Sequence, residues 1–242
     1  MLTYRQYGEI TPTNVKKEDL KMCVICLSHK GVRQPNEQEI RDMWATNPHG
    51  AGYMTTKNGR VEIHKGFMDL KDFLRVIKEE NFTDDDLVVY HFRISTQAGV
   101  TPEMTHPFPL SDELEDMKLL DCLCSVGIAH NGIISLTSTK NAEYSDTALF
   151  ITEYLPALIR DTSDITDKRV KRAIKGLIGS KMVIINGDGD VAVIGDFTAN
   201  ADGLMFSNNH FMPSVKKERD FARTWALGEL YNYPYKTAKI YR

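Results

Sequence analysis

Short apolar runs separated by polar residues recur along the chain, and most of them predict β-strands. CVICLS (23–28) is apolar and rich in β-branched residues, which predicts a buried strand. DLVVYHFRIS (86–95) and the run at 126–130 predict two more strands. MVIINGDGDVAVIGDF (182–197) predicts a pair of strands joined through a Gly-Asp-Gly turn.

Asn58-Gly59 lies between two further strand-like runs, GAGYMTT (50–56) and VEIHKG (61–66). Asn-Gly in such a place is a strong signal for a tight hairpin, because both turn positions favour a positive φ. Residues 97–112 contain three prolines and little periodicity, so they predict a long loop. Loops of that length in compact domains are usually functional or mobile.

Helical spacing of apolar residues marks four other segments. Asn36 predicts a helix that begins with a capping box and ends at Asn47-Pro48. Further helices are predicted at about 69–80 and 167–178. Ser145 predicts the cap of the remaining helix, whose apolar residues are Ala148, Leu149, Ile151, Leu155 and Leu158. Because strands and helices mix without a regular βαβα order, an α+β layered fold with antiparallel sheets is predicted.

The composition is that of a soluble globular protein, since 42% of the 242 residues are hydrophobic and 26% are charged. One domain with a sizeable core is predicted. The net charge of -3 produces no field that would attract a nucleic-acid backbone or an anionic membrane, so neither is a predicted partner. No apolar run approaches the roughly 20 residues that span a bilayer, and the amino terminus lacks a secretory signal, which predicts a cytoplasmic protein.

The sequence pattern divides the chain into three parts. Residues 1–22 are polar and are interpreted as a leader or propeptide, and residues 23–212 as the domain proper. Residues 213–242 carry seven Lys or Arg against three Asp or Glu, interleaved with aromatic residues. We interpret them as a terminal helix and extension docked on the same domain, with nucleic-acid stacking and a partner's surface as alternatives.

Four cysteines are too few for a disulfide-built scaffold of this length, so each is core, metal ligand or nucleophile. Cys23 and Cys26 have a spacing that metal sites use, and Cys122 and Cys124 add a second pair. Positions three apart on a strand point to opposite faces, however, and cannot hold one ion without a turn. No metal and no cofactor is therefore predicted.

Cys23 stands out among them because of its position. A cysteine taken alone is usually a small buried hydrophobe. Cys23 directly follows Met22, and a methionine before a small residue is readily removed. The freed α-amine, with a reference pKa of about 7.7–8.0, would lie within reach of the sulfur of the same residue. Nucleophile and general base would then come from one residue.

Several segments spaced along the domain point together to one family. They are Cys23, NPHGAGYM (47–54), HFRISTQAGVTPEMTHPF (91–108), IAHNGII (128–134) and YSDT (144–147). In order and approximate spacing they resemble the glutaminase domain of class II glutamine amidotransferases, from Cys23 to about Phe211. The resemblance implies a four-layer αββα amino-terminal-nucleophile (Ntn) hydrolase sandwich with two antiparallel sheets. It also implies hydrolysis of the side-chain amide of L-glutamine to glutamate and ammonia through a thioester on Cys23.

The same resemblance implies a role for the polar residues of these motifs. Cys23 would be the nucleophile, while the Asn131 amide and the Gly132 N–H would form an oxyanion hole. Arg93 would bind the α-carboxylate of glutamine through its planar fork, and Asp146 would bind the α-ammonium group. Each also has a structural alternative: a solvated strand-end charge for Arg93, an ordinary turn for Asn131-Gly132, and a carboxylate suited to the helix dipole for Asp146.

Thr96 and His106 match family positions that line the pocket, with less defined roles. Gln97-Ala98 stands where family members commonly carry His-Gly, which affects the loop that would cover bound glutamine. Residues 111–125 are interpreted as a family-variable insertion.

Residues 1–22 decide whether Cys23 can act, since an unprocessed Cys23 has no free α-amine. Lys16–Asp19 can be encoded by purine-rich codons, so we interpret it as a ribosome-binding sequence for initiation at Met22, with a self-excised propeptide as the alternative. The protein would be a free-standing glutaminase or a subunit that passes ammonia to a separate synthase. Two other classes stay open: an Ntn amidase of another amide, and a non-catalytic binding or regulatory protein.

Overall fold

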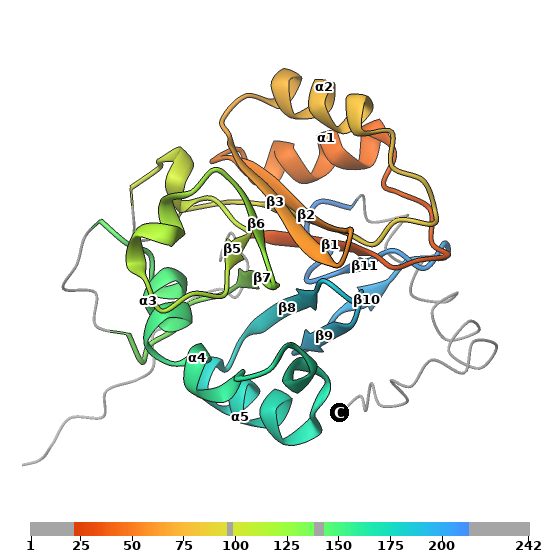
Figure 1. Ribbon diagram of the computed structural model, residues 1–242. Helices are drawn as coiled ribbons and strands as arrows, with labels where there is room; N and C mark the ends of the chain where they lie inside the picture. The colour runs from red at the N-terminus through yellow and green to blue at the C-terminus, as the bar shows by residue number, and fades with distance from the viewer. Residues whose placement is uncertain (1–21, 96–98, 138–142, 213–242) are drawn as a thin grey trace, which may run out of the picture.

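The computed structural model describes residues 22–95, 99–137 and 143–212 of the chain. They form an α+β fold in which two antiparallel sheets combine with helices (Figure 1). The predicted fold class is therefore confirmed at this level. The leader up to residue 21 and the helix predicted within 213–242 lie outside the described residues.

The larger sheet has seven strands in the order β10-β11-β1-β4-β2-β3-β6. Its strands are β1 (Val24–Ser28), β2 (Ala51–Lys57), β3 (Arg60–Phe67), β4 (Val88–Phe92), β6 (Asp121–Cys124), β10 (Thr198–Ala199) and β11 (Met205–Phe206). The smaller sheet has four strands in the order β5-β7-β8-β9. They are β5 (Phe108–Pro109), β7 (Val126–Asn131), β8 (Lys181–Asn186) and β9 (Val191–Ile194). The strand β1 is thus an interior strand of the larger sheet.

Asn58 and Gly59 turn β2 into β3, as the sequence predicts. Both residues have a positive φ, 52° and 73°, which is the conformation that Asn-Gly readily adopts in a two-residue hairpin. The pair β8 and β9 and the strands β1 and β7 also lie where the apolar runs predict them. β4 ends at Phe92, short of the predicted span 86–95, because the chain beyond it leaves the ladder with β1.

Three of the four predicted helices are confirmed. α1 (Glu37–Thr46) begins with the predicted capping box, in which the Asn36 side chain accepts from the backbone N–H of Glu39. α2 (Leu70–Glu80) and α5 (Lys168–Ile178) each begin after an aspartate whose carboxylate accepts backbone N–H bonds. Within the described part of the chain, no helix is long and apolar enough to cross a membrane.

The helix predicted after Ser145 is wrong in its length. The Ser145 side chain caps α3 (Asp146–Glu153) as expected, accepting a backbone N–H of the first turn at 3.2 Å. The helix then ends at Tyr154, and a separate short helix, α4 (Leu155–Leu158), follows. Pro156 lies in the first turn of α4 and has no N–H to continue the hydrogen bonding of α3, so one continuous helix does not form.

The long loop predicted at 97–112 is partly wrong, because it contains a 3₁₀ turn (Pro102–Met104) and the short strand β5. Residues 111–125, interpreted as an insertion, contain a second 3₁₀ turn (Leu114–Lys118) and β6, the edge strand of the larger sheet. Elements of two to five residues are too short to display a hydrophobic period. Sequence patterning could therefore not find them.

A buried lysine ties these two segments to β3. The Lys65 ammonium donates to Glu103 O at 2.8 Å and to Met117 O at 2.7 Å, and it lies 3.8 Å from the centre of the Phe108 ring. Burial lowers the pKa of Lys65 to about 7. Nothing in the local pattern distinguishes Lys65 from a solvated lysine, because only later segments of the chain supply its partners.

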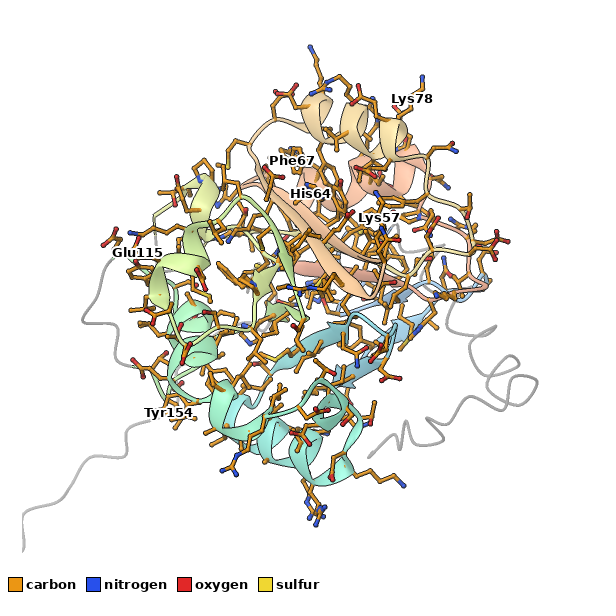
Figure 2. The ribbon with its side chains drawn as sticks, viewed as in Figure 1. Lys57, His64, Phe67, Lys78, Glu115 and Tyr154 are labelled. Carbon is orange, nitrogen blue, oxygen red and sulfur yellow. The ribbon has the colours of Figure 1, made fainter. Side chains whose placement is uncertain are left out.

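Three hydrophobic cores hold the elements together. One packs α1 and α2 on one face of the larger sheet and includes Phe67, which Figure 2 labels. The rings of Phe67 and Phe73 meet edge to face there, with centroids 5.3 Å apart. A second joins the larger sheet to the smaller one through side chains such as Ile63 and Ile185. The third packs α3, α4 and α5 against strands of the smaller sheet, around Phe150.

The two sheets approach closely where β7 carries a glycine. A Cβ atom at Gly127 would lie 2.7 Å from Met54 Sδ and 2.8 Å from Val61 Cγ1, both on the larger sheet. These distances are too short for van der Waals contact, so any larger residue must push the sheets apart or displace both neighbours.

Gly127→Ala should therefore lower the free energy of unfolding by about 1–3 kcal/mol, the usual cost of overpacking a core. Gly176→Ala is the matched control, because Gly176 lies within α5 with no atom within 4 Å of its Cβ position. There alanine should stabilise the helix by roughly 0.5–1 kcal/mol. Urea unfolding followed by circular dichroism measures both changes. Equal stability of the two variants would contradict the tight approach at Gly127.

Candidate active site

Cys23 lies immediately before β1, and the pairing of β1 with β4 determines its neighbours. Val24 pairs with Phe92, so the next step of the antiparallel register brings Cys23 opposite Arg93. Cys23 Sγ lies 3.4 Å from Ile94 N and 3.5 Å from Ile94 O. The backbone N–H of Cys23 itself also acts to lower the pKa of this thiol. The thiol thus lies against the chain that continues from β4.

The segment that begins with β11 fixes the backbone around Cys23. Asn208 Nδ2 donates to Cys23 O at 2.6 Å, and Ser207 Oγ accepts from the N–H of Ile25 at 2.9 Å. Burial raises the pKa of the Cys23 thiol, and the hydrogen bond from the Ile94 backbone opposes that rise. The thiol is therefore protonated at neutral pH and needs a base to become a nucleophile.

The Arg93 guanidinium is buried beside this thiol, with 6% of the residue exposed. Nη1 donates to Gly99 O at 3.1 Å, and Nη2 lies 3.5 Å from Ser95 Oγ. A guanidinium has five N–H groups, so within the described residues most of its donor capacity is unused. Burial lowers the pKa of Arg93, and the negative charges of ionised Cys23 and Asp146 oppose that change.

Asp146 approaches from a third segment, as the first residue of α3. Its Oδ2 accepts from the N–H of Ile134 at 2.6 Å, and its Oδ1 accepts from the N–H of Thr147 at 2.8 Å. The Asp146 charge acts on both Cys23 and Arg93, raising the pKa of each. Three predicted site residues from distant parts of the sequence therefore lie close enough to interact.

Asn131 ends β7 with its side-chain amide beside Ser207. Asn131 Nδ2 lies 2.8 Å from Ser207 Oγ, whereas the buried Asn131 Oδ1 has no partner among the described residues. The two ends of an amide are distinguished by their hydrogen bonds. Turning the amide over lets the Ser207 hydroxyl donate to Oδ1 and leaves the NH₂ group without a protein acceptor. In that orientation Asn131 offers an unpaired donor, as an oxyanion hole requires.

Gly132 follows Asn131 in a conformation that favours glycine, with φ at 145°. A Cβ atom there would overlap the Ser180 side chain and lie 3.6 Å from His130 Nε2. Glycine is thus required at the turn for two separate reasons, the backbone conformation and the close approach of the loop before β8.

Of the two remaining predicted pocket residues, Thr96 lies outside the described residues. His106 is buried, with Nδ1 placed 2.9 Å from His91 Nε2 and 3.0 Å from His130 O. His91 Nε2 lies 3.0 Å from the same carbonyl oxygen. These distances join His106 to the backbone that leads into Asn131, which suits a residue that supports the turn.

The ring of His130 ties the end of β7 to two other elements. His130 Nδ1 lies 2.8 Å from Thr147 Oγ1 in α3, and His130 Nε2 lies 2.7 Å from Ser180 Oγ before β8. Burial lowers the pKa of His91 and of His130 to about 3, and it lowers the pKa of His106 well below its ordinary value. All three rings are neutral at physiological pH.

The sequence indicates no site role for four residues that the structure places around Cys23 and Asn131. They are His91, His130, Ser207 and Asn208. His91 and His130 carry a detectable signal, because each is a single polar ring inside an apolar run that predicts a buried strand. A buried histidine of that kind must find hydrogen-bond partners. Ser207 and Asn208 carry no such signal, since only the pairing of β11 with β1 brings them to Cys23.

One cysteine from each suspected metal pair lies in a different hydrophobic core. Cys26 is buried in the core shared with α1 and α2, and Cys124 lies in the core between the sheets. Across residues 22–95, 99–137 and 143–212, no group of three or more His, Cys, Asp or Glu could hold a metal ion.

No known family model matches the chain, and no curated protein matches it either. Inference about function therefore rests on the chemistry of these residues, on their geometry and on the resemblance between motifs.

The three buried histidines should make the protein sensitive to acid. An unfolded histidine takes up a proton below about pH 6.5 while the buried ring stays neutral, so each such ring costs about 1.4 kcal/mol of stability per pH unit below that value. His106→Asn keeps a donor for His130 O but does not titrate, so its stability should fall less steeply between about pH 7 and pH 5. Urea unfolding at several pH values measures the slope.

His210→Asn is the control, because His210 is exposed in the folded chain. The slope of His106→Asn is compared with the slope of this variant. An unchanged slope in His106→Asn would mean that His106 is protonated in the folded protein and that its pKa is not lowered.

Proposed function

We propose that the domain is a glutaminase of the class II glutamine amidotransferase type, with Cys23 as its nucleophile. The observation that carries the proposal is the cluster of Cys23, Arg93 and Asp146, which combines a thiol with one cation and one anion. Such a pair of charges complements the α-carboxylate and α-ammonium groups of a free amino acid. The succession of cores also supports the four-layer αββα Ntn arrangement, since helices pack on one face of each sheet and the sheets pack on each other.

The reaction needs a base at Cys23, and the local geometry supports the α-amine in that role. The Cys23 nitrogen and Sγ belong to the same residue and are separated only by Cα and Cβ. When Cys23 is the first residue, that nitrogen accepts the thiol proton and Sγ attacks the side-chain carbonyl carbon of glutamine. The C–N bond then breaks, ammonia leaves with the transferred proton, and water hydrolyses the thioester to glutamate.

Substrate recognition would use capacity that Arg93 and Asp146 retain. Arg93 has N–H groups beyond those directed to Gly99 and Ser95, enough for a two-pronged bond to a carboxylate. The Asp146 carboxylate accepts two backbone N–H bonds and has lone pairs left for an ammonium group. Both side chains are held by the fold before substrate binds, which lowers the entropic cost of binding.

The Asn131 amide and the Gly132 N–H would stabilise the negative oxygen of the tetrahedral intermediate. The hydrogen bond between Asn131 and Ser207 and the contacts of His91 and His106 with His130 O restrain this turn. Donors fixed in advance stabilise developing charge without reorganisation.

One observation favours a second candidate, a binding or regulatory protein without catalysis. Burial raises the pKa of the Cys23 thiol, so a chain that retains residues 1–22 has neither a thiolate nor a free α-amine at this position. An amidase of another substrate would need the nucleophile but not both Arg93 and Asp146. The ammonia formed by a glutaminase would be released or passed to a separate synthase subunit.

Cys23→Ala should reduce ammonia release from glutamine by at least about 10³-fold, the scale expected for loss of a nucleophile. The comparison uses protein whose intact mass places Cys23 at its amino terminus. Cys122→Ala is the matched control. It should keep its activity, because Cys122 lies on β6, which β4, β2 and β3 separate from β1 in the larger sheet. Equal rates for the wild type and Cys23→Ala would exclude Cys23 as the nucleophile.

Arg93→Lys tests the amino-acid specificity. Lysine keeps the charge but loses the planar fork, so the glutamine KM should rise by about 10–100-fold, as expected for loss of about 1.4–2.8 kcal/mol. A thiol-reactive glutamine analogue at saturating concentration should still label Cys23. Arg41→Lys, a change at an exposed helix position paired with Glu37, is the control. An unchanged KM in Arg93→Lys would remove Arg93 from carboxylate binding.

A further inference from the structure

Two cysteines lie side by side on the edge of the larger sheet. Cys122 and Cys124 belong to β6, which pairs with β3 on one side and is the last strand in the sheet order (Figure 1). They are two positions apart on a strand, so their side chains point to the same face. Cys124 is 8% exposed in the core between the sheets, while Cys122 is only partly buried. Cys122 is therefore the more exposed of the two residues, and Cys124 lies deeper on the same face.

The two sulfurs differ in acidity. The interaction between the two thiols lowers the pKa of Cys122 and raises the pKa of Cys124. The Cys124 thiol also donates to Val126 O, 3.2 Å away. The nearby Lys65 ammonium lowers the pKa of Cys122 further. A partly exposed thiol next to a cation is the type that oxidants attack, whereas a buried thiol is inert until a neighbour is activated.

We propose that Cys122 and Cys124 form a redox-modification site, which a hydroperoxide oxidises to an intramolecular disulfide. The Cys122 thiolate attacks the peroxide, an S–O bond forms, the O–O bond breaks, and the leaving hydroxide takes up a proton. The resulting sulfenic acid is then attacked by the Cys124 sulfur, which loses its proton. The S–S bond forms, the S–O bond breaks and water leaves. The pair loses two electrons, which the peroxide gains.

A disulfide between two residues of one strand would be strained, and this strain should make the bond easy to reduce. Cα atoms two positions apart on a strand are about 6.6–6.8 Å apart, at the upper end of the range that disulfides span. Closing the bond must shorten β6, which is possible because β6 is the last strand of the larger sheet among the described residues. The ladder of β6 with β3, where Ile63 pairs with Cys122, would loosen. A strained disulfide is reduced more easily than a relaxed one.

The other cysteine pair in the chain provides an internal comparison. Cys23 and Cys26 are three positions apart, and their side chains lie on opposite sides of the chain. Cys26 is fully buried, and burial raises its pKa well above the ordinary value. Oxidation should therefore form no disulfide between these two residues in the folded protein.

Hydrogen peroxide added to the folded full chain tests the proposal, followed by alkylation of free thiols in denaturant and digestion with trypsin. Residues 119–140 form one tryptic peptide that holds Cys122 and Cys124, and residues 22–30 form another that holds Cys23 and Cys26. Peptide 119–140 should lose both alkylation sites and the mass of two hydrogen atoms, and dithiothreitol should restore it. Peptide 22–30 should form no internal disulfide.

Single variants separate the two steps. Cys124→Ser should stop the reaction at the sulfenic acid of Cys122, which dimedone traps as an adduct on peptide 119–140. Cys122→Ser should slow oxidation of Cys124 by at least about tenfold, because the remaining thiol is buried and poorly acidic. This readout is independent of glutamine hydrolysis, so it stands whatever the outcome at Cys23.

Three results would overturn the proposal. Peptide 119–140 could keep both free thiols under peroxide, or Cys122 could proceed to sulfinic acid while Cys124 stays reduced. An internal disulfide formed equally fast in peptide 22–30 would mean that oxidation occurs in unfolded chains.

Discussion

The antiparallel pairing of β1 with β4 is the constraint on which the candidate site depends. With Val24 opposite Phe92, Cys23 lies opposite Arg93, and its sulfur lies against the backbone of Ile94. A shift of one residue would send every side chain of β1 to the other face. Because alternate residues of β1 pack into two different cores, both faces of the strand resist such a shift. Core packing therefore fixes which cation stands beside the thiol.

Buried polar groups, and not apolar packing, hold the end of β7. They lie in surroundings that disfavour a charged side chain. Neutral His91 and His106 lie against His130 O, and the His130 ring joins α3 to the loop before β8. Their hydrogen bonds restrain the Asn131-Gly132 turn from behind. The same low polarity that gives these bonds their strength prevents the rings from taking up protons. A rigid turn and a sensitivity to acid are thus two consequences of one arrangement.

The strand β6, at the edge of the larger sheet, is held by fewer neighbouring strands than β1. β6 is an edge strand with one neighbour, and it carries the two adjacent thiols. Lys65 lies between this edge and the interior, since its ammonium lowers the pKa of Cys122 and donates to the carbonyls of Glu103 and Met117. An oxidation at the edge would therefore act on the same lysine that holds the segment leading to β5.

The sequence by itself determined the elements that depend on local chemistry. Asn58-Gly59 predicts its hairpin and Asn36 its capping box, and the apolar runs predict most of the long strands, because turn conformation, capping and periodicity involve neighbours in the chain. It did not determine the short strands β5, β6, β10 and β11, nor the break at Pro156 that the helical pattern hid. Among site residues, the motifs indicated Arg93 and Asp146, but their closeness to Cys23 and the contact from Asn208 were decided by tertiary structure alone. Those contacts join segments far apart in the chain, and only the packing of both sheets brings such segments together.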